Sequence, residues 1–156
     1  MSEISANESP TGLERRMVHR LLIHWREALG EEKTLPSLDD VMGRDLGDIA
    51  PLIYVLNLPE GGEPEFASLG EAFSGSEYGD LAGKPLSAVP EGTLLKNALG
   101  YYKNILDKKV PITMGGDFTD SQGKTVFYRS IIVPLSGGGD EIGQLLGAAN
   151  FKNKED

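Results

Sequence analysis

The chain has 156 residues, of which 24 are acidic and 15 are basic, and it contains no cysteine. This length suits one domain with a substantial hydrophobic core, and 39% hydrophobic with 25% charged residues is typical of a globular protein. Without cysteine, disulfides, zinc–thiolate sites, iron–sulfur clusters and thiol catalysis are excluded. The formal net charge of −9 makes nucleic acid and anionic membrane surfaces poor partners.

The chain begins with a polar and acidic segment, residues 1–10, which predicts a disordered tail. This segment lacks the apolar stretch of a secretory signal. No window elsewhere approaches the ~18 apolar residues of a transmembrane helix. A cytoplasmic location without a membrane partner is therefore expected.

Residues 11–30 predict a long amphipathic helix. Thr11 and Glu14 have the spacing of a capping box, and Gly30 is suited to end the helix. Apolar residues recur every four positions, at Leu13, Met17, Leu21, Trp25 and Leu29. Further apolar residues make this stripe wider than one packing face requires. We therefore expect the helix to cover the sheet edge and also to form a homodimer contact, through Met17, Leu21, Leu22 and Trp25.

Residues 31–92 predict short elements separated by turns. Pro36-Ser37 introduces a short capped turn at 38–40, and a second turn at 45–50 should end at Pro51. The other elements expected here are strands at 52–58 and 65–69 around a Gly61-Gly62 turn, helical turns at 70–83, and a loop at 85–92.

Residues 93–109 predict a second long helix, because apolar residues recur at three- and four-residue spacing and Pro111 follows. Strand-like runs come next, at 112–118, 124–135 and 142–151. The turns between them are short, which favours antiparallel hairpins, since a parallel crossover requires more chain. The element order predicts an α+β fold in which 31–152 form one domain after the first helix and 153–156 form a disordered tail.

The side chains that could carry chemistry form no complete catalytic set. His19 and His24 are five residues apart, whereas two metal ligands on one helix face need a spacing of four. A nucleophile elbow and a phosphate-binding loop are both absent at the required spacing. Asp117 and Asp120, near Gly123, lack a calcium-loop pattern and predict turn chemistry. We therefore predict no metal site and no enzymatic activity.

Arg129 is the one charged residue in the apolar run 127–135. If side chains alternate, it shares a face with Phe127, Ile131, Val133 and Leu135. An inward arginine requires a salt bridge or an anionic ligand, and both explanations are open, as is exposure at an edge. The residues that could line a ligand pocket, or simply pack in the core, are Phe66, Phe73, Tyr78, Leu99, Tyr102, Tyr128 and Arg129.

Several segments together resemble a PAS domain, and more specifically the stand-alone single-domain proteobacterial PAS subtype. The string GEAFSGSEYGDLAGKPL at 70–86 is similar to the helical middle of that fold. The other segments, in the order of the subtype, are LLIHW at 21–25, PSLDD at 36–40, APLIYVLN at 50–57, PLS at 134–136 and LLG at 145–147. The similarity spans residues 17–151.

The resemblance implies a five-stranded antiparallel sheet with a long N-terminal cap helix and a long helix packed near the sheet. It also implies a bacterial, cytoplasmic, homodimeric sensory module that binds a small molecule or a protein partner in signal transduction. The cofactor is unknown. A flavin–cysteine adduct is not expected because the chain has no cysteine, and histidine-ligated haem in the PAS core is not expected because both histidines lie on the leading helix.

Two alternatives to a ligand-binding sensor remain open. A ligand-free interaction scaffold with a filled core is favoured by the second strand, 65–69, which lacks the arginine that such strands usually carry. A small cone-shaped α+β enzyme is the other alternative, with Asp117 or Glu71 as its base.

Overall fold

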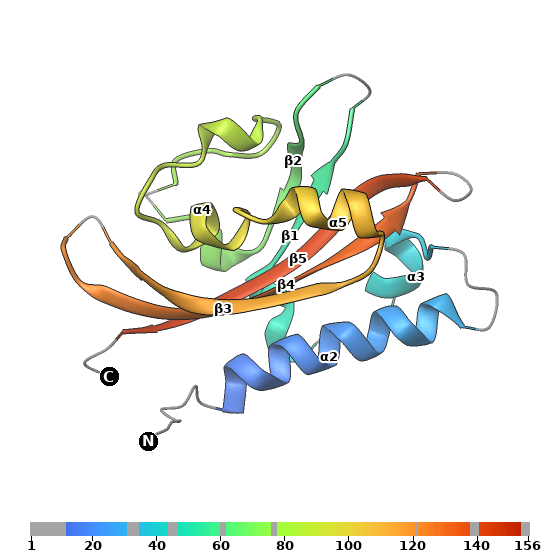
Figure 1. Cartoon of the computed structure of the whole chain (residues 1–156), viewed down its shortest axis with the longest axis horizontal. Helices are drawn as coiled ribbons and strands as arrows, with labels where there is room; N and C mark the ends of the chain where they lie inside the picture. The colour runs from blue at the N-terminus through green and yellow to red at the C-terminus, as the bar shows by residue number, and fades with distance from the viewer. Residues whose placement is uncertain are drawn as a thin grey trace.

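The computed structural model describes residues 12–30, 35–43, 47–59, 62–75, 78–120, 122–137 and 141–153. Within them the chain forms an antiparallel sheet with the strand order β2-β1-β5-β4-β3, and helices cover both faces (Figure 1). The strands are β1 (Ile53–Asn57), β2 (Glu65–Leu69), β3 (Ile112–Thr119), β4 (Thr125–Ser136) and β5 (Ile142–Asn153). The predicted α+β class and five-stranded antiparallel sheet are confirmed.

The predicted ends of the chain lie mostly outside the described residues. This holds for the tail at 1–10, for the capping residue Thr11 and for 154–156. Asn153, the first residue of the predicted C-terminal tail, is the last residue of β5.

Helix α2 (Gly12–Leu29) covers one face of the sheet, with α3 (Leu38–Met42) and the 3₁₀ helix η1 (Gly47–Leu52) beside it (Figure 1). Trp25 anchors the helix, because its Nε1–H donates to the carbonyl oxygen of Pro134 at 2.7 Å. Gly30, with a φ of +59°, follows the last turn as predicted. Neither α2 nor any other described helix combines the length and the apolar character that a membrane crossing requires.

The residues expected at a homodimer contact through α2 are largely used inside the chain. Met17, Leu21 and Trp25 are buried against the sheet of their own chain. The apolar stripe is wide because the helix lies across a broad sheet surface. Leu22 is half-buried and Ile23 is exposed, so a contact between copies through α2 would have to use these two side chains.

Short helical segments cover the opposite face of the sheet (Figure 1). They are the 3₁₀ helices η2 (Glu71–Phe73) and η3 (Leu86–Ala88) and the α-helices α4 (Leu94–Ala98) and α5 (Tyr102–Lys108). The core on this side is separate from the core under α2. We call it the α4–α5 core.

The structure corrects the prediction of one continuous helix at 93–109, because Leu99, Gly100 and Tyr101 separate α4 from α5. Glycine has a low helix propensity. Tyr101 leaves the helical conformation, with φ −116° and ψ 16°. Its side chain turns toward the sheet, where its hydroxyl lies 2.8 Å from Ser130 Oγ.

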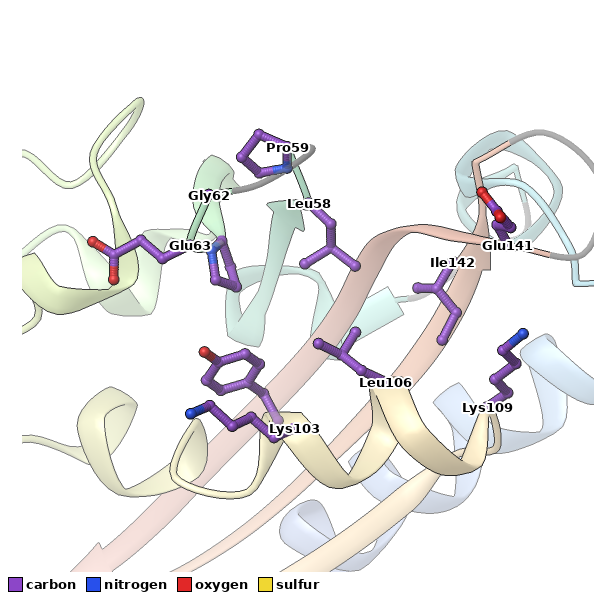
Figure 2. A pocket seen from close by; sticks show the side chains of 11 residues that line it. Leu58, Pro59, Gly62, Glu63, Lys103, Leu106, Lys109, Glu141 and Ile142 are labelled. Carbon is purple, nitrogen blue, oxygen red and sulfur yellow. The ribbon is translucent and has the colours of Figure 1, made fainter.

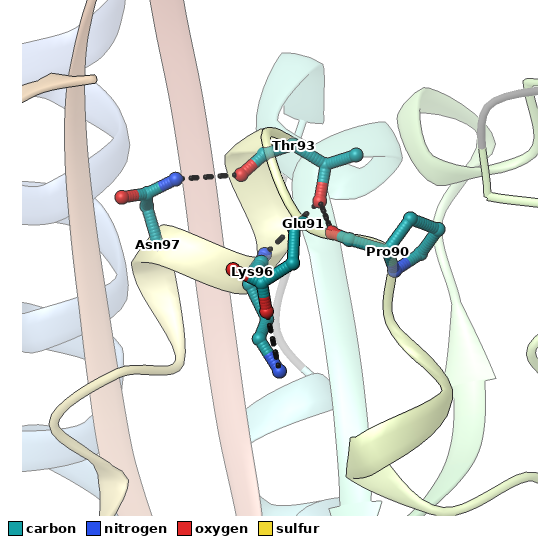
Figure 3. A network of polar contacts seen from close by, with 5 residues as sticks. All are labelled: Pro90, Glu91, Thr93, Lys96 and Asn97. Carbon is teal, nitrogen blue, oxygen red and sulfur yellow. Dashed lines mark hydrogen bonds and ion pairs between the residues drawn. The ribbon is translucent and has the colours of Figure 1, made fainter. Parts of the chain in front are cut away.

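Helix α4 begins in a network of polar contacts around Thr93 (Figure 3). The Thr93 hydroxyl accepts a hydrogen bond from the Lys96 N–H at 3.3 Å and donates to the Pro90 carbonyl at 2.8 Å. The Asn97 side chain donates to the Thr93 carbonyl at 2.9 Å, and Lys96 and Glu91 form an ion pair at 3.4 Å. The bond from the Lys96 N–H pairs a donor of the first turn that has no partner within the helix.

Helix α3 has the cap that the sequence predicts, whereas η1 does not end where expected. Ser37 Oγ accepts from the Asp40 N–H and the Asp40 carboxylate accepts from the Ser37 N–H, each at 3.1 Å. The prediction that Pro51 ends the second turn is wrong, since η1 runs through Pro51 to Leu52. A short 3₁₀ helix has few backbone hydrogen bonds to lose, so it tolerates the missing N–H of proline.

Replacing Trp25 with phenylalanine should lower the free energy of unfolding by about 2 kcal/mol, because the Pro134 carbonyl loses its donor and a void remains. Ile23 lies on the same helix but is exposed, so I23A should cost less than about 0.5 kcal/mol. Urea unfolding followed by circular dichroism measures both. Equal losses would show that Trp25 does not anchor α2.

Candidate functional site

Three hydroxyl groups lie close together in the largely apolar α4–α5 core. They belong to Tyr54 on β1, Tyr101 before α5 and Ser130 on β4. Apart from tyrosines, the buried polar side chains of the described residues are Thr93 and Ser130, and no buried side chain among them is charged. We call Tyr54, Tyr101 and Ser130 the hydroxyl cluster.

Two members of the hydroxyl cluster bond to each other. Tyr101 OH and Ser130 Oγ are 2.8 Å apart, and either can be the donor. Longer contacts of 3.5 Å lead from the Tyr101 hydroxyl to the Ile112 carbonyl and from the Ser130 hydroxyl to the Met114 carbonyl. The break before α5 positions Tyr101 for this contact, and alternation along β4 points Ser130 toward it.

The third member, Tyr54, has a hydroxyl that is buried without a hydrogen-bond partner among the described residues. Its ring lies over Gly147 on the neighbouring strand β5, where an added Cβ would collide with the ring. A buried hydroxyl without a partner costs about 1–3 kcal/mol. Such an atom marks a position where a polar atom of a ligand or a water molecule would be stabilised.

Burial keeps the hydroxyls of this region protonated. It raises the pKa of Tyr54 well above its ordinary value, and the neighbouring Tyr101 adds to this shift. Burial also raises the pKa of Tyr101 to about 12, although the hydrogen bond to Ser130 lowers it in part. The pKa of Tyr128 is raised by burial and by Asp117. At neutral pH all three tyrosines can therefore donate a hydrogen bond.

A line of aromatic rings connects Tyr54 with the surface. The rings of Tyr54 and Phe73 meet edge to face with centroids 5.7 Å apart, and those of Phe73 and Tyr78 do so at 5.9 Å. The Tyr78 hydroxyl accepts a hydrogen bond from the Leu95 N–H at 3.4 Å. Phe73 thus lies between the hydroxyl cluster and the outer tyrosine.

A pocket of about 520 Å³ lies at the outer end of this line, beside the turn between β3 and β4. We call it the hairpin pocket. Its polar side chains are those of Tyr78, Asp120, Gln122 and Asn150. The apolar and glycine positions of its lining are Leu52, Ala72, Gly75, Gly92, Leu94, Phe118, Val126, Ala149 and Phe151. The pocket therefore offers a ligand both apolar contacts and polar groups.

A second pocket, also of about 520 Å³, lies between α5 and the loops that follow β1 and precede β5 (Figure 2). We call it the α5 pocket. Leu58, Leu106 and Ile142 converge at its centre (Figure 2). Its charged side chains are Glu63, Lys103, Lys109 and Glu141. Because the two signs balance, the α5 pocket has no clear preference for an anion or a cation.

Six of the seven predicted pocket residues lie in the layer between the sheet and α4–α5. Four of them, Phe66, Phe73, Tyr78 and Leu99, are buried in the α4–α5 core. Tyr102 and Tyr128 are half-buried beside it. Tyr78 lines the hairpin pocket and Tyr102 lines the α5 pocket. The structure thus places these residues together, with much of the space filled by their own rings.

Arg129 does not belong to this group, because its side chain lies on the opposite face of the sheet. The predicted alternation is right, since Ile131, Val133 and Leu135 are buried under α2. Arg129 is half-exposed, and its Nε is buried without a hydrogen-bond partner in the described part of the chain. Phe127 on the same face is 43% exposed, so this end of β4 reaches solvent and Arg129 needs no buried counter-charge.

The members of the hydroxyl cluster are not evident from the sequence. Alternation within β1 places Tyr54 on the same face as the apolar Leu56, which indicates that Tyr54 is buried in the core. Ser130 lies two residues after Tyr128 on β4, so alternation places it on the same face of the sheet as that predicted pocket residue. This is a weaker indication that Ser130 faces the α4–α5 core. Nothing local pairs Tyr101 with Ser130, because their contact depends on the helix break.

Asp120 stabilises the β3–β4 turn, as the sequence predicts, whereas Asp117 lies within β3. Asp120 Oδ1 accepts hydrogen bonds from the N–H groups of Gln122 and Lys124, each at 2.9 Å. Within the described ranges, no three potential metal ligands lie together.

Comparison with family models finds no match, and comparison with curated proteins finds none either. The solved structures to which the chain is similar include LOV and PAS domains. The PAS domain from Bordetella pertussis BvgS is 18% identical, with a TM-score of 0.42 over 65% of this chain and 74% of that one. The LOV domain from the Erythrobacter litoralis EL346 blue-light activated histidine kinase is 8% identical, with a TM-score of 0.47 over 65% and 95%.

The Rhodobacter sphaeroides LOV protein is 10% identical, with a TM-score of 0.46 over 88% of this chain and 67% of that one. At such identities and TM-scores, these similarities say nothing about what this chain binds.

Removing the two tyrosine hydroxyls one at a time should have opposite effects. Y101F leaves Ser130 Oγ without its close partner and should lower the free energy of unfolding by about 1–2 kcal/mol. Y54F removes an unpaired buried hydroxyl and should leave stability unchanged or raise it by about 1 kcal/mol. Denaturant unfolding of ligand-free protein measures both. A loss for Y54F equal to that for Y101F would contradict an unpaired Tyr54 hydroxyl.

Stability should fall as pH rises from 10 to 12. Unfolded tyrosines lose their protons near pH 10, whereas folded Tyr101 keeps its proton up to about pH 12, so the unfolded chain binds fewer protons in this window. The contribution is fully present below pH 10 and is lost above it. Thermal unfolding in this range measures the slope, which should be shallower in Y101F. An equal slope in both proteins would argue against the burial of Tyr101.

Proposed function

We propose that this chain is a non-enzymatic sensory or regulatory module of PAS type that binds a small molecule on the α4–α5 side of its sheet. The observation that carries the proposal is the Tyr54 hydroxyl, which is fully buried and unpaired beside the Tyr101–Ser130 pair. The hairpin pocket supports it, because Tyr78, Leu94 and Ala149 belong both to that pocket and to the α4–α5 core.

The surroundings limit the chemistry of the ligand. The α4–α5 core has no buried charge among the described residues, so a charged ligand would lack a counter-charge. Tyr54 keeps its proton and can donate a hydrogen bond. We therefore propose a neutral, mostly apolar molecule with one acceptor, such as a carbonyl oxygen or a ring nitrogen. It would enter through the hairpin pocket and displace Phe73.

A ligand-free interaction scaffold is the second candidate, and the aromatic line favours it. Tyr54, Phe73 and Tyr78 already fill much of the space between the sheet and the helices. The third alternative, an enzyme of cone-shaped fold, gains no support from its two candidate bases. Glu71 and Asp117 are both exposed and do not face the α4–α5 core.

The finer features implied by the resemblance belong to the same proposal. They are a bacterial, cytoplasmic protein of the stand-alone proteobacterial subtype and a signal passed on to a protein partner. A homodimer contact through α2 stays a prediction, and it rests on Leu22 and Ile23 now that its other expected residues are buried.

Native mass spectrometry of gently purified protein tests ligand binding directly. We expect a mass above that of the bare chain by one small molecule, which is lost on denaturation. The conservative variant Y54F should lose at least ~80% of this species, because one buried hydrogen bond of about 1–1.5 kcal/mol changes affinity roughly tenfold. Y102F, which alters the α5 pocket, is the matched control and should keep it. A bare chain from its native host would favour the scaffold.

A further inference from the structure

The two edges of the sheet differ in how they are covered. At one edge, the segment 83–86 runs along β2: the Phe66 N–H donates to the Lys84 carbonyl at 2.9 Å, and the Gly83 N–H donates to the Phe66 carbonyl at 2.8 Å. At the other edge, β3 pairs only with β4 within the described residues. Figure 1 shows β3 as the outermost strand on its side.

The register with β4 decides which backbone groups of β3 face outward. The Asp120 N–H donates to the Lys124 carbonyl at 2.9 Å, and pairing continues without a shift from Thr119↔Thr125 to Ile112↔Ile132. Hydrogen-bonded pairs alternate in an antiparallel ladder, so the even-numbered residues of β3 bond to β4. The N–H and C=O groups that point away from β4 are those of Thr113, Gly115, Asp117 and Thr119.

Strand β3 lacks most of the usual protection of a free edge and carries one charged side chain, Asp117. Proteins block such edges with charged side chains, lysine above all, with proline, with bulges or by keeping the strand very short. Strand β3 has eight residues, ITMGGDFT, and pairs with β4 without a bulge. Residues 113–117 are exposed, and Met114 keeps 38% of its surface accessible. This edge is therefore open to pairing with another strand.

We propose that this edge pairs with the same edge of a second copy of the chain, so that one antiparallel sheet runs through both copies. A two-fold axis at Gly115 places Thr113 opposite Asp117 of the copy and Gly115 opposite its own counterpart. These pairs supply about six backbone hydrogen bonds. The same axis places Ile112 opposite Phe118 on the face of the α4–α5 core, which joins two apolar side chains.

Charge and side-chain size favour this register. An axis at Asp117 would bring two carboxylates face to face, which is unfavourable. With the axis at Gly115, the two Asp117 side chains lie apart, and the exposed Met114 lies opposite Gly116 and gains cover. The net charge of −9 on each copy opposes association, but salt screens it beyond about 8 Å at physiological ionic strength. Added salt should therefore strengthen the dimer, whereas it would weaken binding of a basic peptide.

Two opposite charges at position 113 test the register. T113E places a carboxylate opposite Asp117 twice in each dimer and should weaken dimerisation roughly tenfold. T113K places an ammonium group there and should strengthen it by a similar factor. Sedimentation equilibrium from about 1 µM to roughly 1 mM covers the range in which such contacts dissociate. Circular dichroism confirms that the variants fold.

Two further variants separate this contact from others. S68E makes the same charge change at the covered edge, and I23E changes the exposed side of α2, so neither should alter dimerisation strongly. In the unaltered chain, amide exchange of Gly115 and Asp117 should slow with rising concentration, while Met114 and Gly116, already bonded to β4, should not change.

The proposal is wrong if the chain stays monomeric at roughly 1 mM, if T113E and T113K act alike, or if I23E alone dissociates the dimer. The last result would place the contact on α2. None of these outcomes bears on ligand binding in the α4–α5 core, because the two proposals rest on different residues.

Discussion

The two-sided burial of strand β5 is the constraint on which the other elements depend. This strand pairs with β1 on one side and with β4 on the other, so it joins the two parts of the sheet. Leu145 and Ala149 face the α4–α5 core, whereas Leu146 and Ala148 face the core under α2. The residues in its middle, Gly147, Ala148 and Ala149, are small, which leaves room above the strand for larger side chains. Gly147 is the clearest case, since the Tyr54 ring occupies the space that a side chain would take.

The two faces of the sheet are consequently built for different purposes. Under α2, one long helix covers aliphatic residues and is anchored by the Trp25–Pro134 hydrogen bond. On the other face, short segments enclose aromatic rings and hydroxyl groups, and both described pockets lie there. A ligand of the kind proposed would bind on the face of the α4–α5 core, while the packing under α2 stabilises the sheet.

Local patterns predict most of the fold, because strand alternation and helical periodicity are properties of short segments. All five strands and α2 follow from them, as does the cap of α3. The break between α4 and α5 is different, because the 93–109 periodicity continues across Gly100. The low helix propensity of this glycine and the contact of Tyr101 with Ser130 both favour the interruption. Arg129 shows a related limit, since alternation gives the correct set of neighbours but not which face of the sheet they occupy.

The candidate site is predictable only in part for the same reason. Aromatic residues of the middle segment, such as Phe73 and Tyr78, follow from composition and position. The hydroxyl cluster does not, because it joins residues from β1, the helix break and β4 that are distant in sequence. Whether a buried polar atom has a hydrogen-bond partner depends on residues that are close in space and distant in sequence.

The lengths of the helices imply an uneven distribution of local stability. Helix α2 has 18 residues, whereas α4 has five and α5 has seven. Helices shorter than about 12 residues do not persist in water without tertiary packing. The layer over the α4–α5 core thus consists of pieces that cannot stay helical alone, and it should open at a lower free energy than the α2 side. A molecule that enters beneath this layer would alter how often the layer melts and re-forms, even where the average positions of its atoms hardly change.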